Sequence, residues 1–185
     1  MNFQTLALIK HPLVSAWSAM RDELPQLVAH MDDIESITTT ERIASPGQVV
    51  IINIWRAKPK LPEMLARHVD TTKFAWTDHA VWDEQTKTCR WHIEPHVFSD
   101  YFKSRGETLF QPAMGGRGTR ITFSGEAEMK LGPLGNGLGK MLENTLLKGA
   151  MSFVQGSISN NYRKIIEALE KHLNGETSAV SMRPK

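Results

Sequence analysis

LGPLGNGLGKMLENTLLKGAMSFVQGSISNNYRKIIEALEKHL, residues 131–173, contains the longest helical pattern in the chain. Its apolar side chains recur every three or four residues, which predicts one helix over 137–173 with a continuous apolar stripe. The stripe consists of Leu147, Met151, Val154, Ile158, Tyr162, Ile165 and Leu169. The first half of the helix carries a second apolar face, so we expect it to bury against a further partner besides a sheet. This second face consists of Leu138, Leu142, Leu146, Gly149 and Phe153.

The elements before this helix predict the α+β class. Residues 3–9 predict a strand, HPLVSAWSAMRDEL (11–24) predicts a helix, and LPQLVAHM (24–31) predicts a second short helix. Residues 33–131 are β-type runs separated by turn signals, which predict about six further strands. We therefore expect a curved antiparallel sheet of about seven strands, with two short helices after the first strand and the long C-terminal helix packed over the sheet.

This order of elements, together with two stretches of sequence, resembles one known superfamily. The two stretches are IKHPLVSAWSAMRD (9–22), which follows the first strand, and the closing stretch 131–173. On these residues the chain resembles the START-like helix-grip superfamily, also called SRPBCC, which includes polyketide cyclase/dehydrase-like and birch-pollen-allergen-like proteins. The resemblance implies a curved sheet that grips the long helix, with an apolar cavity between them. Members bind, carry or transform different hydrophobic molecules, so the resemblance implies a class of ligand and not one activity.

Composition restricts the classes of function. The chain has 185 residues, a formal net charge of +2 and one cysteine, Cys89. The small net charge, spread over scattered residues, does not favour nucleic-acid binding, and a single cysteine excludes an intrachain disulfide and fits the reducing cytoplasm. No apolar run reaches the roughly 18 residues of a membrane span. We expect a cytoplasmic protein of one domain (1–174) with a disordered tail (175–185), no nucleic-acid partner, no stable membrane insertion and no cofactor.

Turn signals set the strand pairing that we expect, and this pairing separates an apolar face from a charged one. The turns DEQTK, HVFSD and GGRG join the four strands involved. They predict the pairs His79 with His92, Trp91 with Gly106, and Phe110 with Phe123. Because Gly106 has no side chain, we expect it to leave room for the indole of Trp91.

Three potential metal ligands, His92, Glu94 and His96, alternate along one predicted strand and therefore share a face. In the expected pairing this face is the charged, outward one, and two basic residues of the next strand lie across from it. Neighbouring cations oppose a bound dication, so we expect no metal. His79, predicted beside His92, is the feature that favours a metal site.

Asp78 is the most informative single residue, because it is a carboxylate on the predicted apolar face. Such a group is costly unless it is paired, hydrogen-bonded or in contact with water. It predicts either a polar anchor for a ligand, a general base, or a strand-edge position that reaches water. Tryptophans on the same face supply apolar area and N–H donors, although core packing explains them equally well. The candidate ligand-binding residues are Asn53, Trp55, Trp76, Asp78, Trp82, Trp91, Phe110, Phe123, Leu142, Leu146 and Phe153.

These features favour a protein that binds or transports a hydrophobic small molecule, such as a lipid, an aromatic or a polyketide-like compound, between the sheet and the C-terminal helix. A basic loop with Leu61, Met64 and Leu65 is expected to gate this cavity. One alternative is an enzyme of the polyketide cyclase/aromatase type, with Asp78 as its acid–base group. The other is a protein-interaction module without a ligand.

Overall fold

A computed structural model describes residues 1–58, 75–96, 102–129 and 160–176. Within these ranges the chain forms one seven-stranded antiparallel sheet with helices on one side of it. The elements are β1 (Asn2–Ile9), α1 (Leu13–Asp22), η1 (Leu24–His30), β2 (Ile34–Ser45), β3 (Gln48–Ala57), β4 (Ala75–Asp83), β5 (Thr88–Pro95), β6 (Phe102–Ala113), η3 (Met114–Gly116), β7 (Gly118–Met129) and a C-terminal helix over 160–173. This confirms the predicted α+β class and the order of its elements. The predicted gate residues and the first part of the predicted long helix lie outside the described ranges.

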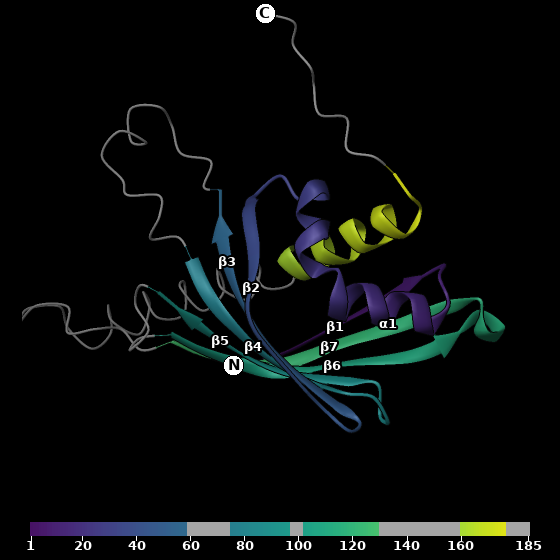
Figure 1. The fold of residues 1–185 in the computed structure, drawn as a ribbon, viewed down its shortest axis with the longest axis horizontal. Coiled ribbons are helices and arrows are strands. Elements are labelled where there is room, and N and C mark those ends of the chain that lie inside the picture. Colours follow the sequence, from purple (N-terminus) through teal and green to yellow (C-terminus); the bar gives the residue numbers. More distant parts are fainter. Residues whose placement is uncertain (59–74, 97–101, 130–159, 177–185) are drawn as a thin grey trace, which may run out of the picture.

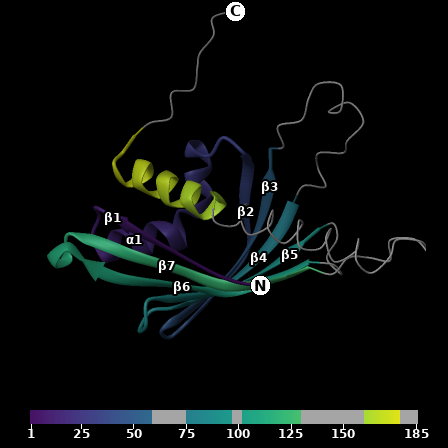
Figure 2. The same cartoon turned by 180° about the vertical axis from the view of Figure 1, so that it is seen from behind.

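The sheet is open and curved, and its strand order is β1-β7-β6-β5-β4-β3-β2. The strands β2 to β7 follow one another as antiparallel neighbours, while β1 pairs with β7. The chain must therefore pass from one edge of the sheet to the other between β1 and β2, and α1 and η1 occupy this connection. Figures 1 and 2 show both of these helices and the C-terminal helix on the concave side of the sheet, and the convex side faces away from them.

Helix α1 follows Pro12, which occupies the N-cap position, where its missing N–H costs no helical hydrogen bond. The buried face of the helix consists of Ala16, Trp17, Ala19 and Met20. The Trp17 ring meets Trp82 of β4 and Phe110 of β6 edge-on, with ring centroids 5.0 and 5.2 Å away. Its indole N–H lies 3.2 Å from the Glu84 carboxylate. These contacts anchor the helix on the sheet.

The C-terminal helix packs against the same face through a buried stripe. This stripe consists of Tyr162, Ile166, Ala168 and Leu169. The Tyr162 ring stacks on Phe123 of β7 at 4.5 Å, and its hydroxyl donates to the Ile121 carbonyl at 3.4 Å. The ion pair Lys164–Asp33 and a hydrogen bond of 2.6 Å between His172 Nε2 and the Glu23 carboxylate hold the helix to the β1–β2 connection. The described part of the helix therefore contacts both the sheet and the segment that crosses it.

Two of the three predicted hairpin registers are confirmed. His79 pairs with His92, and Trp91 pairs with Gly106. A Cβ atom at Gly106 would lie 2.6 Å from Trp91 Cζ2 and 2.1 Å from the Ser124 carbonyl oxygen, so the close approach requires glycine there. The expectation that Gly106 leaves room for the indole is also confirmed.

The predicted register of the β6–β7 hairpin is wrong by two residues. Phe110 pairs with Ile121 and not with Phe123. The strands end at Ala113 and Gly118, because a short 3₁₀ turn with positive φ at Met114 and at both following glycines closes the hairpin earlier than the sequence suggested. A shift of two residues preserves the side of the sheet on which each side chain lies. The predicted division into an apolar and a charged face is therefore unaffected.

None of the described helices combines the length and the hydropathy that a membrane-spanning helix needs.

Candidate ligand-binding face

The concave face carries a row of polar side chains across three strands, which we call the carboxyl row: Thr39, Asn53 and Asp78. A β-bulge between Thr39 and Glu41 shifts the pairing of β2 with β3. It leaves Thr39 opposite Asn53, which is itself opposite Asp78. The bulge also reverses the alternation of β2, which is why the inward face of this strand could not be assigned from its sequence. The importance of Thr39 was missed for the same reason.

Hydrogen bonding orients the carboxyl row. The Thr39 hydroxyl donates to Asn53 Oδ1 at 2.8 Å. This leaves the Asn53 amide N–H₂ to donate to the neighbouring Asp78 carboxyl group. Asn53 is only 3% exposed although it lies in the apolar run VVIINIW. A buried amide in such a strand is stable because both of its polar atoms are used.

Burial raises the pKa of Asp78 from 3.8 to about 7. Two neighbouring N–H groups, from Trp55 and Asn53, act in the opposite direction and lower it. Loss of hydration disfavours the charged carboxylate more than these donors restore it. The Asp78 carboxyl can therefore accept or release a proton near neutral pH, which an ordinary surface aspartate cannot do.

The indole N–H groups of Trp55 and Trp91 on this face have no hydrogen-bond acceptor among the described residues. Trp55 and Trp91 are 6% and 8% exposed, and neither Nε1 atom has an acceptor of acceptable geometry. The Trp55 N–H lies close enough to Asp78 to lower its pKa but does not complete a hydrogen bond with it. Trp55 stacks on Trp76 with ring centroids 5.6 Å apart. This end of the face thus combines stacked aromatic rings, an available donor and a titratable carboxyl.

The remaining predicted binding residues occupy a different environment. Trp82 and Phe110 lie beneath Trp17 of α1, in what we call the tryptophan cluster (Trp17, Trp82 and Phe110). Trp91 and Phe123 stack on each other at 4.8 Å, and Phe123 is covered by the C-terminal helix. The structure therefore places these four rings in contacts with the protein itself. Leu142, Leu146 and Phe153 lie outside the described residues.

Cys89 lies within this packed region. It is 4% exposed, and burial raises the pKa of its thiol. A neutral, buried thiol behaves as a small apolar group and not as a nucleophile.

A hollow of about 450 Å³ lies between the β1 edge and the start of the described C-terminal helix. Its lining consists of Thr5, Leu6, Ala7, Asn160, Tyr162, Arg163, Ile166 and Glu167. Tyr162 forms part of both this hollow and the aromatic stack on Phe123. The hollow therefore lies at the β1 edge of the sheet and shares no residue with the carboxyl row.

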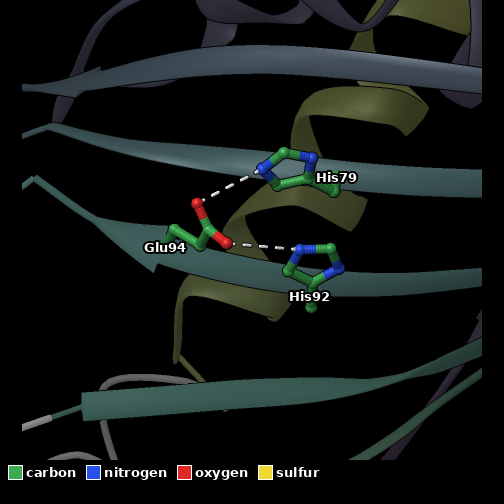
Figure 3. A group of neighbouring side chains, drawn as sticks. All are labelled: His79, His92 and Glu94. Atoms are coloured by element: carbon green, nitrogen blue, oxygen red, sulfur yellow. Dashed lines mark ion pairs between the residues drawn. The ribbon is translucent and has the colours of Figure 1, made fainter. Parts of the chain in front are cut away.

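The residues that could hold a metal lie on the convex face. His79, His92 and Glu94 bring one ligand atom each within 4.8 Å of one another. Figure 3 shows their side chains converging on the face away from the C-terminal helix. His96, the third ligand expected from the sequence, instead has its Nε2 atom 2.9 Å from the Thr77 hydroxyl. The structure thus replaces His96 with His79 in this group.

Comparison with known proteins identifies the fold. No protein-family model matches the chain, and no curated protein matches it either. Among solved structures, the protein TTHA0849 from Thermus thermophilus superposes with a TM-score of 0.65 and 17% identity, covering 96% of this chain and 100% of that one.

Two further structures agree with this result. Ara h 8.0201 has a TM-score of 0.60 and 17% identity, with coverage of 95% and 99%. The Zhui aromatase/cyclase from Streptomyces sp. R1128 has a TM-score of 0.57 and 12% identity, with coverage of 92% and 94%. The likeness spans the curved antiparallel sheet, the short helices and the C-terminal helix. The chain therefore shares the helix-grip fold of these structures, a curved antiparallel sheet packed against a C-terminal helix.

Proposed function

We propose that this protein binds a hydrophobic small molecule with a ring system and one polar end on the concave face of its sheet. The observation that carries the proposal is the carboxyl row, which is held by hydrogen bonds within an aromatic surface. Burying a carboxyl group there costs free energy that packing alone does not return. A ligand oxygen or nitrogen at Asp78 gives this partly buried group a partner, and the protein then uses the carboxyl for recognition.

The surrounding side chains support a ligand that is mainly apolar. Trp55 and Trp76 present stacked rings next to the carboxyl, and aromatic ligands favour such surfaces. The Trp55 N–H supplies a donor for a carbonyl or hydroxyl oxygen of the ligand. Ligand sites generally combine apolar walls with a few fixed polar groups, and both kinds of group lie side by side on the concave face, which supports the proposal. Lipids, aromatic compounds and polyketide-like compounds all meet this description.

The second candidate function is catalysis of ring closure or dehydration on such a molecule. A pKa of about 7 favours it, because a carboxyl that titrates near neutral pH can act as a general base and then as a general acid. In this role Asp78 would remove a proton beside a ligand carbonyl, while the Trp55 N–H would hold the carbonyl oxygen. The name of one structural neighbour, an aromatase/cyclase, is compatible with this role as an analogy of fold alone.

Native mass spectrometry of the purified full chain tests the binding proposal. We expect the protein to retain a hydrophobic molecule that organic extraction releases, or to take up an added polycyclic phenol with one polar end. Asp78→Asn should lower the affinity for that phenol by about tenfold, because each tenfold change corresponds to about 1.4 kcal/mol, the size of one hydrogen bond to a charged or polar group. The matched control is Glu107→Gln, which makes the same chemical change on an exposed position of β6.

Equal loss of affinity in both variants, or no uptake by the wild-type chain, would contradict the binding proposal. Catalysis is tested separately by incubating the complex with a linear polyketide-like substrate and following ring formation. In that case Asp78→Asn should abolish turnover while the fold is retained. Unchanged turnover in the variant would remove Asp78 from the mechanism and leave it as a binding group only.

A further inference from the structure

We propose that His79, His92 and Glu94 form a binding site for Zn²⁺ on the convex face of the sheet. The three residues come from two neighbouring strands, because His79 of β4 pairs directly with His92 of β5 and Glu94 follows two residues later on the same face. Their side chains point toward a common position in Figure 3. This site is independent of the proposed function, because His79 and Asp78 are adjacent on β4 and face opposite sides of the sheet.

The distances between the ligand atoms are close to those of a tetrahedral zinc site. His79 Nε2 lies 3.5 Å from one Glu94 oxygen, and His92 Nε2 lies 3.6 Å from the other. Zinc bound at about 2.0–2.1 Å to nitrogen and oxygen keeps its ligand atoms about 3.3 Å apart. The two imidazole rings are already parallel, with centroids 4.3 Å apart and an interplanar angle of 3°. Because the nitrogen lone pairs lie in the ring planes, the two stacked rings must turn toward each other for one ion to bind both histidines and Glu94, whose ligand atoms already lie within 4.8 Å of one another.

An unsatisfied polar atom gives independent support. The Nε2 atom of His79 is shielded from water and has no hydrogen-bond partner among the described residues. The Glu94 carboxylate is near this atom but not in hydrogen-bonding geometry. Buried polar atoms are almost always satisfied by protein, water or an ion, and an exception calls for an explanation. A metal ion bound to His79 Nε2 provides one.

The neighbouring charges do not oppose the ion as strongly as the sequence suggested. Arg105, which pairs with His92 across β5 and β6, directs its guanidinium to Glu126 at 2.5 Å. Its positive charge is thus balanced by a carboxylate of β7, and the Glu94 carboxylate remains for the metal. The expectation of no metal depended on cations across from the ligands, and the structure pairs one of these cations, Arg105, with Glu126.

The donor set and its surroundings favour zinc over hard cations. Two imidazoles and one carboxylate are typical ligands of Zn²⁺, whereas Mg²⁺ and Ca²⁺ prefer oxygen alone. The side chains of His92 and Glu94 are 51% and 62% exposed, so the ion can reach them from solvent. Both histidines also border a hollow of about 660 Å³ on the convex face. Three protein ligands leave a fourth position for water in a four-coordinate zinc ion.

Isothermal titration of the untagged full chain with ZnCl₂ tests this site. We expect one Zn²⁺ per chain, with affinity lowered tenfold or more in His92→Ala and in Glu94→Gln. These two residues are largely exposed, so both variants should fold, and circular dichroism checks that they do. The matched control is His11→Asn, which removes an exposed imidazole near the C-terminal helix and should leave the affinity unchanged.

Three results would overturn the proposal. The first is no zinc binding by the wild-type chain, and the second is equal affinity in the wild type and both variants. The third is equal binding of MgCl₂, which would indicate general attraction of cations to a charged face. Loss of zinc binding in these variants with ligand uptake retained on the concave face would support the metal site whether or not the proposed function is correct.

Discussion

Trp82 and Asp78 lie on the same strand and face the same side of the sheet, yet their surroundings are opposite. Trp82 is 5% exposed and meets the Trp17 ring of α1 at 5.0 Å. Asp78 meets an amide, an indole N–H and stacked rings, and burial raises its pKa to about 7. One end of the concave face is therefore filled by the protein's own helix, and the other end carries polar groups that a ligand can use.

This difference separates residues that stabilise the fold from the residues that we propose for ligand binding. In the tryptophan cluster every ring contacts another ring of the same chain, so its contribution is to the free energy of unfolding. In the carboxyl row the partly buried Asp78 carboxyl, with its raised pKa, reduces stability at neutral pH, and the proposed ligand would give this group a partner. Removing the Asp78 charge should therefore affect stability in the opposite direction to truncating a ring of the tryptophan cluster, and the two changes should differ in their effect on ligand affinity.

The largest effect is expected at the tryptophan cluster. Trp17→Ala should lower the free energy of unfolding by about 3–5 kcal/mol, because it removes a fully buried aromatic side chain and leaves a cavity. Chemical denaturation measures this loss, and the folded fraction should still bind the ligand. The control is Val14→Ala on the exposed face of α1, which is 71% exposed and should change stability little. A loss below about 1 kcal/mol for Trp17→Ala would show that this end is not the packed one.

The second largest loss of stability is expected at Gly106, where β6 lies against β7. Gly106→Ala should cost about 3 kcal/mol, because its Cβ atom would overlap the Ser124 carbonyl oxygen and the Trp91 ring. The backbone contact cannot be relieved by a rotamer change. Thermal unfolding compares this variant with Glu107→Ala at the adjacent exposed position. A variant as stable as the control would mean that Trp91 does not lie against Gly106.

At high pH, Asp78→Asn should raise the free energy of unfolding, whereas the two preceding variants lower it. The folded-state pKa of about 7 lies above the unfolded value of 3.8, so the contribution of Asp78 to stability is complete below pH 3.8 and is lost as the pH rises to 7. The full shift corresponds to an upper limit of about 4 kcal/mol. We expect Asp78→Asn to raise the free energy of unfolding by about 2 kcal/mol at pH 8 and to change it little at pH 4. Equal differences at the two pH values would contradict the raised pKa.

The smallest effect is expected at the outer end of the carboxyl row. Thr39→Val should lower stability by about 1 kcal/mol, because the Asn53 amide oxygen loses its donor. It should also weaken ligand binding, since the amide is then free to turn away from Asp78. Thr40→Val is the matched control, because the Thr40 hydroxyl is exposed and bonds only to the Ile52 carbonyl at 3.2 Å. If both variants bind the ligand equally well, the orientation of Asn53 is not part of recognition.

The sequence predicted the sheet better than it predicted the site, for physical reasons. Alternation of apolar and charged residues determines which face each side chain occupies. The two-residue error at the β6–β7 turn did not change these faces, because side chains alternate with a period of two. The polar contrast of Asp78 within an apolar face was also visible in the sequence. The bulge at Thr40 could not be predicted from the sequence, because a run of three threonines has no alternation of apolar and polar residues. The division of the concave face into two ends depends on where α1 lies, and strand patterns alone cannot show that.

The metal group illustrates the same limit. Alternation identified His92 and Glu94 on one face, but His96 has the same spacing and the sequence could not separate it from His79. The predicted pairing already placed His79 beside His92, and the structure adds that the His96 ring contacts Thr77 instead of joining the group.

The most direct test of the central claim is the pKa of Asp78, measured by following its carboxyl ¹³C resonance against pH in the ligand-free protein. The Asp78→Asn variant identifies the resonance, and Asp83, whose pKa is lowered by hydrogen bonds from Thr86, serves as the internal reference. The raised pKa predicts a midpoint near 7 that moves when a ligand binds at the carboxyl row. A midpoint near 3.8 that does not respond to the ligand would show a hydrated carboxylate and would contradict a binding role for this end of the face.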